Sequence, residues 1–242
     1  MYTLYIANKN YSSWSLRPWA LLTELGIPFE EKLVPFGDVP PGGNWATFRT
    51  FSPSGRVPCL QDGDLTVWDS LAIVEYLAER HPGVWPKEAR ARAWSRSACA
   101  EMHSGFERLR EHCSMSCGQR IRLADGPRQA IAGDLARLRE LWEQGLDRFG
   151  GPFLAGESFT GVDAFFAPVV FRIRGYGLDA VGLDAGGLDI GPKAAAYAER
   201  MLALGAMRAW DEAALREPWR DPGHEAGILA NGELLQDLRT GA

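Results

Sequence analysis

The stretch RVPCLQDGDLTVWDS, residues 56–70, decides how the first third of this 242-residue chain folds. Pro58 has no backbone N–H, so a strand that begins there leaves the backbone groups of the preceding residue free to face an outside ligand. Asp62-Gly63-Asp64 is a hairpin turn signal, and Asp69-Ser70 stands directly before an apolar-periodic run that predicts a helix. We therefore expect a free backbone edge beside a helix N-terminus.

The start of that helix has two interpretations. Unpaired amides and the helix dipole favour a carboxylate at a helix N-terminus, and the Ser70 hydroxyl adds a donor there. The Asp69-Ser70 pair also suits an ordinary N-cap with no ligand. Next to a free backbone edge at residue 57, the first interpretation predicts a site for a peptide-like anion.

The N-terminus predicts a βαβ unit. Residues 2–7 alternate β-forming side chains and predict a strand. A helix follows over about 11–22, with serines able to cap it and Pro18 acceptable only in its first turn. Gly26 ends the helix, and residues 29–34 predict a second strand. The ligand edge of such a unit lies at the carboxyl end of the first strand.

The run Ser12-Ser13-Trp14-Ser15-Leu16-Arg17 resembles the cytosolic glutathione S-transferase superfamily, in its bacterial serine-type form, and the resemblance extends over nearly the whole chain. The run is similar to the Ser-Ser-Cys-Ser-x-Arg run of zeta-class enzymes and to the Cys-Pro-x-x-x-Arg run of omega-like ones. In both, the active residue lies five before the arginine. The resemblance thus implies that Ser12 activates the thiol of glutathione, with Ser13 and Ser15 as alternative hydroxyls.

The same resemblance gives roles to the stretch at 56–70. Val57-Pro58 is similar to the family's cis-proline pair, whose first residue exchanges backbone hydrogen bonds with the cysteinyl part of glutathione. Asp69-Ser70 is similar to its Glu/Gln-Ser pair, which holds the γ-glutamyl carboxylate, although Asp is one methylene shorter. The implied catalytic residue is Ser12, and the implied glutathione-binding residues are Ser12, Arg56, Val57, Pro58, Asp69 and Ser70.

The composition changes at His81–Pro86, where short β-rich runs give way to long helical patterns. We expect an α/β thioredoxin-like, glutathione-binding domain at 1–80, a linker at 81–87, and an all-helical (all-α) domain at 88–242 that ends in an extension without a family counterpart. Apolar residues of that extension predict that it packs on the rest, with the pocket mouth as one candidate position.

Apolar spacing predicts five helices in the second domain. The third begins at Thr160, where Asp163 completes a capping box that resembles the family's Ser/Thr-x-x-Asp box. The glycine-rich stretch 182–191 is expected to be a connector. The predicted helices span about 88–117, 126–149, 160–176, 193–204 and 207–217.

The composition limits the class of protein. A net charge of −5 without a compensating basic block disfavours nucleic-acid binding, and no apolar run approaches the ~20 residues that cross a bilayer. The start lacks the features of a secretory signal, so we expect a cytoplasmic protein. The four cysteines show no zinc or CxxC spacing and predict reduced thiols, and the four histidines predict no metal site.

The resemblance implies a glutathione transferase that uses glutathione as co-substrate and attacks a small electrophile, and that assembles as a homodimer. A glutathione-dependent isomerase like maleylacetoacetate isomerase is one alternative, and a non-catalytic glutathione-binding or interaction protein on the same fold is another. A serine at position 12 argues against thiol reduction, because a hydroxyl forms no mixed disulfide. Candidates for the electrophile pocket are Tyr11, Trp14, Trp45, Met102, His103, Phe106 and Arg110.

Overall fold

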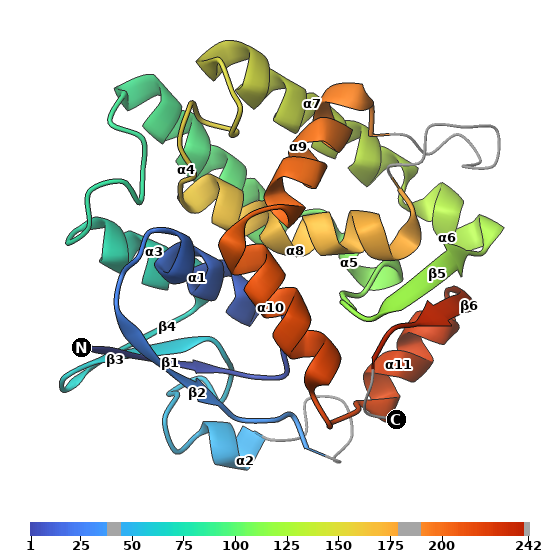
Figure 1. Ribbon diagram of the computed structural model, residues 1–242, viewed down its shortest axis with the longest axis horizontal. Coiled ribbons are helices and arrows are strands. Elements are labelled where there is room, and N and C mark those ends of the chain that lie inside the picture. The colour runs from blue at the N-terminus through green and yellow to red at the C-terminus, as the bar shows by residue number, and fades with distance from the viewer. Residues whose placement is uncertain (38–44, 179–189, 240–242) are drawn as a thin grey trace.

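A four-stranded mixed sheet forms the N-terminal part of the computed structural model, which describes residues 1–37, 45–178 and 190–239 (Figure 1). The strand order is β2-β1-β3-β4; β1 and β2 are parallel and the other neighbours antiparallel. Residues 182–189 of the expected connector lie outside the described ranges. The strands are β1 Tyr2–Ile6, β2 Phe29–Leu33, β3 Cys59–Asp62 and β4 Leu65–Trp68.

The predicted βαβ unit is confirmed, with helix α1 (Ser13–Glu24) between its two strands. The predicted hairpin at Asp62-Gly63-Asp64 is also confirmed, because β3 and β4 pair antiparallel across it. The placement of Pro18 in the first turn was wrong. Pro18 is the sixth residue of α1, inside the helix, where it has no backbone N–H to donate to the helical hydrogen bonds. The remaining helices of this part are α2 Trp45–Phe48 and α3 Ser70–Ala78.

The rest of the chain is mainly helical, as predicted, and lies against one side of the sheet domain (Figure 1). The predicted helix at 126–149 is present as two helices joined at Ile131, and the last three predicted helices agree within a few residues at each end. The helices are α4 Ala89–Ser104, α5 Glu107–His112, α6 Asp125–Ala130, α7 Ala132–Phe149, α8 Gly161–Tyr176, α9 Pro192–Leu202, α10 Gly205–Arg216 and α11 Pro222–Leu229.

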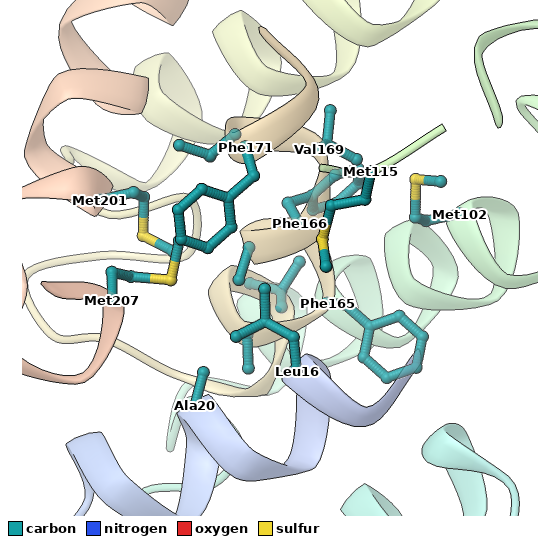
Figure 2. Close-up of a cluster of buried hydrophobic side chains, with 14 of the residues drawn as sticks. Leu16, Ala20, Met102, Met115, Phe165, Phe166, Val169, Phe171, Met201 and Met207 are labelled. Atoms are coloured by element: carbon teal, nitrogen blue, oxygen red, sulfur yellow. The ribbon is translucent and has the colours of Figure 1, made fainter. Parts of the chain in front are cut away.

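The two parts share one core, in which α1 packs against α8 (Figure 2). Leu16 and Ala20 of α1 point towards α8, whose Phe165 extends towards α1. All three side chains are fully buried. Burial of a large apolar side chain contributes roughly 1.5–3 kcal/mol, so this interface fixes the helical part against the helix that starts at Ser13.

The capping box at the start of α8 is present as predicted. The Asp163 carboxylate accepts hydrogen bonds from the backbone N–H of Thr160 (2.9 Å) and of Leu154 (3.0 Å), and from the hydroxyl of Tyr197 (3.0 Å). Burial nevertheless outweighs these bonds and raises the pKa of Asp163 to about 6.

The prediction of one helix over 88–117 was wrong. α4 ends at Ser104, because Phe106 adopts a left-handed conformation (φ 53°), and α5 begins afresh at Glu107 with the backbone N–H of Leu109 capped by Asp134 (2.8 Å). Residues 113–118 are not helical, since the N–H groups of Cys117 and Gly118 bond instead to Asn10 (3.2 and 3.0 Å). These tertiary bonds replace the helical ones.

The C-terminal extension forms α11 and a strand, β6 (Gly232–Asp237), which pairs antiparallel with β5 (Gln119–Leu123). Both strands are additions to the expected all-helical domain. The extension lies beside the loop that precedes α1 (Figure 1), where the Tyr11 hydroxyl donates to Glu225 and accepts from Arg239. The predicted packing of the extension on the rest of the chain is therefore confirmed.

The described residues contain no group of three His, Cys, Asp or Glu side chains able to hold a metal ion. Among the same residues, no helix combines the length and the apolar character that a membrane span requires. All four cysteines are buried and free of disulfides.

Candidate active site

A cavity of about 510 Å³ lies between the start of α1 and the helical part. Its sheet-domain side carries the serines that begin α1 and the loop before Pro58, and its other side is built from α5, α8, the segment after α5, and α11. It is lined by Tyr11, Ser12, Ser13, Trp14, Phe36, Trp45, Phe48, Gly55, Arg56, Val57, Arg110, Ser114, Met115, Arg172 and His224.

A second cavity, of about 330 Å³, shares Trp14, Arg56 and Val57 with the first and extends to the start of α3. It contains Asp69 and Ser70 together with Pro58. The two cavities therefore bring together all six residues that the sequence suggested, although these residues come from three separate segments of the chain.

Ser12 stands directly before the first residue of α1 and is only 5% exposed, at the wall of the larger cavity. Its hydroxyl donates to the hydroxyl of Ser15 (2.7 Å), which also accepts from the backbone N–H of Ala7 (3.4 Å). The Ser12 side chain makes no capping bond to the helix. The hydroxyl thus sits at the positive end of the helix dipole without being used as a cap.

The Val57–Pro58 peptide bond is cis, and Val57 lines both cavities. Pairing between β1 and β3 begins only at Cys59. Within the described residues, neither the N–H nor the C=O of Val57 takes part in a backbone hydrogen bond. This residue can therefore offer one donor and one acceptor to an extended peptide. Arg56 beside it is exposed at the rim.

Asp69 caps α3: its Oδ1 accepts from the backbone N–H of Leu71 (2.8 Å), and its backbone takes a positive φ of 74°. Its other oxygen lies 3.4 Å from Nε2 of His103. Ser70 is fully buried and accepts a hydrogen bond from Arg17 (3.3 Å). The Ser70 hydroxyl and the Arg17 guanidinium that donates to it thus meet at the N-terminus of α3. This combination favours binding of a carboxylate.

The Arg17 guanidinium lies between two aromatic rings, with Cζ 4.3 Å from the ring centroid of Trp14 and 4.4 Å from that of Phe165. Burial lowers the pKa of Arg17 to about 9, so the side chain remains a cation at neutral pH. The Trp14 and Phe165 rings stabilise that cation where water is excluded. Arg17 therefore supplies a fixed positive charge behind Ser70.

The candidates for an electrophile pocket divide into three groups. Tyr11, Trp14, Trp45 and Arg110 line the larger cavity, and His103 faces Asp69 instead. The other two candidates are buried in the core and line neither cavity. They are Met102 and Phe106.

Sequence reasoning missed seven residues that line the cavity. They carry no local motif, and four of them come from the segment after α5, from the C-terminal half of α8 and from the C-terminal extension. Only the apolar character of the extension indicated that it packs somewhere. The missed residues are Phe36, Phe48, Gly55, Ser114, Met115, Arg172 and His224.

Three other ionisable groups near the site are unsuited to activating or replacing a thiol. Burial and the neighbouring Glu225 raise the pKa of Tyr11, whose hydroxyl is occupied by the C-terminal extension. Burial raises the pKa of Cys59 to about 11 and that of Cys113 to about 12, so both thiols stay protonated at neutral pH. The serines at the start of α1 remain as hydroxyl donors.

Comparison with known proteins agrees with this geometry. Residues 11–80 match the family model described as "Glutathione S-transferase, N-terminal domain". The chain is 26% identical over 180 residues to maleylacetoacetate isomerase of Rattus norvegicus, covering 73% of this chain and 80% of that protein. It is 27% identical to glutathione S-transferase 1 of Dianthus caryophyllus, covering 73% of this chain and 79% of that one.

Among solved structures, a glutathione transferase from Methylococcus capsulatus is 25% identical and superposes with a TM-score of 0.64, covering 88% of this chain and 98% of that one. The α/β thioredoxin-like domain followed by helices, the cis-proline and the serine-rich start of α1 are combined in one chain. The chain belongs to the cytosolic glutathione S-transferase superfamily.

Proposed function

We propose that this protein is a glutathione S-transferase that activates the thiol of glutathione for attack on a small electrophile, with Ser12 as the activating residue. The observation that carries the proposal is the buried Ser12 hydroxyl at the N-terminus of α1, beside an edge of free backbone at Val57. An unperturbed thiol titrates near ~8.5, and only the thiolate attacks.

Glutathione would lie along the two joined cavities. The backbone of Val57 next to Pro58 would pair with the cysteinyl unit, and Asp69 and Ser70 would hold the γ-glutamyl end, with Arg56 at the rim. This arrangement directs the cysteinyl sulfur towards Ser12. In this proposal residues 1–80 form the glutathione-binding domain, 81–87 the linker, and 88–242 the domain that completes the electrophile pocket.

The serine pair supports a chain of donors towards the sulfur. In the structure Ser12 donates to Ser15, which also accepts from the backbone N–H of Ala7. With a thiolate bound, both hydroxyls would turn, so that Ser15 donates to Ser12. A hydroxyl rotates to suit its partner, so Ser12 then donates to the thiolate. Each bond polarises the next, and the dipole of α1 adds positive potential at the same point. The proton of the thiol leaves to solvent when the thiolate forms.

The test measures the pKa of bound glutathione by the ultraviolet absorbance of the thiolate, in wild type and in Ser12→Ala. We expect kcat to fall by about 10²–10³, as for loss of one donor to a developing charge, while the affinity for glutathione stays nearly unchanged. Ser13→Ala is the matched control. Unchanged turnover in Ser12→Ala would remove that residue from the mechanism, and a loss in Ser13→Ala instead would transfer the role.

A glutathione-dependent isomerase is the second candidate. It is favoured by the zeta-like run at Ser12–Arg17 and by the similarity to the rat maleylacetoacetate isomerase. Addition and later loss of the same thiolate would isomerise a double bond without consuming glutathione. Glutathione consumption during turnover distinguishes the two reactions. Glutathione binding without turnover of any electrophile would favour the non-catalytic alternative.

We also propose that the protein works in the cytoplasm as a symmetric homodimer, as the family resemblance implies. The four buried, unpaired cysteines support a reducing compartment. Light scattering after size exclusion tests the assembly: a mass of about twice 26.7 kDa supports it, and a monomer mass at every concentration contradicts it.

A further inference from the structure

Two arginines reach the larger cavity from the helical part. Arg110 is on α5 and Arg172 is on α8, and both line the wall opposite the serines of α1. Arg172 is only 6% exposed and donates from Nη1 to the backbone carbonyl of Cys113. The Nε atoms of both arginines are buried and have no hydrogen-bond partner among the described residues.

Neither arginine has a carboxylate to balance its charge in the described part of the chain. The ion pairs found there include neither side chain, and the residues that line the cavity include no Asp or Glu. Burial, and to a smaller extent Arg110, lower the pKa of Arg172 to about 10, so it remains a cation at neutral pH. A buried charge without a partner is unfavourable.

The positive charge of Arg110 and Arg172 lies apart from the proposed glutathione-binding edge. The γ-glutamyl end is expected at Ser70, where Arg17 already supplies a cation. Arg110 lies against Trp14, with Cζ 5.8 Å from the ring centroid, on the side that faces the helical part. The lining of the same cavity also includes apolar groups, among them Phe36 and Met115.

We propose that the second substrate carries a carboxylate or a comparable anionic group, and that Arg110 and Arg172 bind this group while its carbon body lies on the apolar wall. This inference rests on the proposed function. In the reaction, the thiolate sulfur forms a bond to the electrophilic carbon, the bond to the leaving group breaks, and that group departs with the electron pair. The anionic group takes no part in bond making; it orients the carbon towards the sulfur.

The test uses two electrophiles with the same benzylic carbon, 4-(chloromethyl)benzoate and its methyl ester. We expect kcat/KM to be at least about tenfold higher for the carboxylate, as for one or two hydrogen bonds to a charged group. Arg110→Met and Arg172→Met should abolish that preference. Arg108→Met is the matched control, because Arg108 is on the same helix but points to solvent, with its side chain 62% exposed and paired with Glu111.

A preference for the ester in wild type, or a carboxylate preference that survives in both cavity variants, would overturn the proposal. Binding of 4-methylbenzoate and of 4-methylbenzamide, measured by calorimetry with and without glutathione, decides the case if neither electrophile reacts. Arginine-dependent benzoate binding without any glutathione binding would refute the proposed function alone. Glutathione binding with equal affinity for benzoate and benzamide would refute the arginine site alone.

Discussion

The carboxylate of Glu217 accepts a hydrogen bond from the backbone nitrogen of Lys9 at 2.6 Å, although 208 residues separate the two. Its second oxygen accepts from the backbone N–H of Asn10 (3.1 Å), and Trp210 donates to the carbonyl of Lys9 (2.8 Å). These groups hold the loop that leads into Ser12. The helical part therefore positions the hydroxyl that the sheet domain presents.

Replacing Glu217 should damage both stability and turnover. Glu217→Gln turns one acceptor into a donor that faces a buried N–H, so we expect a loss of about 1–3 kcal/mol in the free energy of unfolding. The value of kcat should fall more than the affinity for glutathione, because the loop before Ser12 loses its anchor. Urea denaturation and steady-state kinetics measure the two effects. Glu212→Gln, on the exposed face of α10, should change neither.

Ser15 should act as a positioning residue through Ser12. We expect Ser15→Ala to raise the pKa of bound glutathione and to lower kcat, but by less than Ser12→Ala does, because only one link of the donor chain is lost. Titration of the thiolate absorbance measures the pKa directly. A pKa identical to that of wild type, with kcat unchanged, would contradict this role and leave Ser15 as a packing residue.

The packing of the C-terminal extension should depend on Arg239. The side chain of this arginine is only 1% exposed and pairs with both Glu225 and Asp237. We expect Arg239→Met to lower the free energy of unfolding by about 3 kcal/mol, at the lower end for a broken buried pair because its partners are partly exposed. Arg122→Met is the control: this arginine also forms an ion pair beside β6, but at the surface. Arg122→Met should lower the free energy of unfolding by at most about 1 kcal/mol. Equal losses in the two variants would contradict the prediction.

Asp163 should make stability depend on pH in the acidic range. Its pKa in the folded protein is about 6, against an ordinary value of 3.8. Between these values the folded protein binds more protons than the unfolded chain, so the contribution of this group is greatest below pH 4 and is lost as the pH rises through 6. Relative to Asp163→Asn, wild type should therefore lose up to about 3 kcal/mol between pH 4 and 6. Denaturation curves across that range measure the difference, and a constant difference would contradict it.

Much of the proposed glutathione-binding edge could be predicted from the sequence because its signals are local. A proline without an N–H, a turn at Asp62-Gly63 and a capping pair at Asp69-Ser70 act through the chemistry of neighbouring residues. The same local rules failed at 104–118, where helical spacing continues but the backbone bonds to Asn10 and Asp134 instead. Contacts between distant segments decide such cases.

The sequence alone determined the βαβ unit, the N-termini of α1 and α3, and the family resemblance that indicates Ser12. Only the tertiary structure decided what stands opposite that serine. Arg172 and His224 belong to α8 and α11, and nothing in their local sequence says that they reach the cavity. Periodicity shows which face of a helix is apolar, but the neighbour of that face is set by how all the helices pack together.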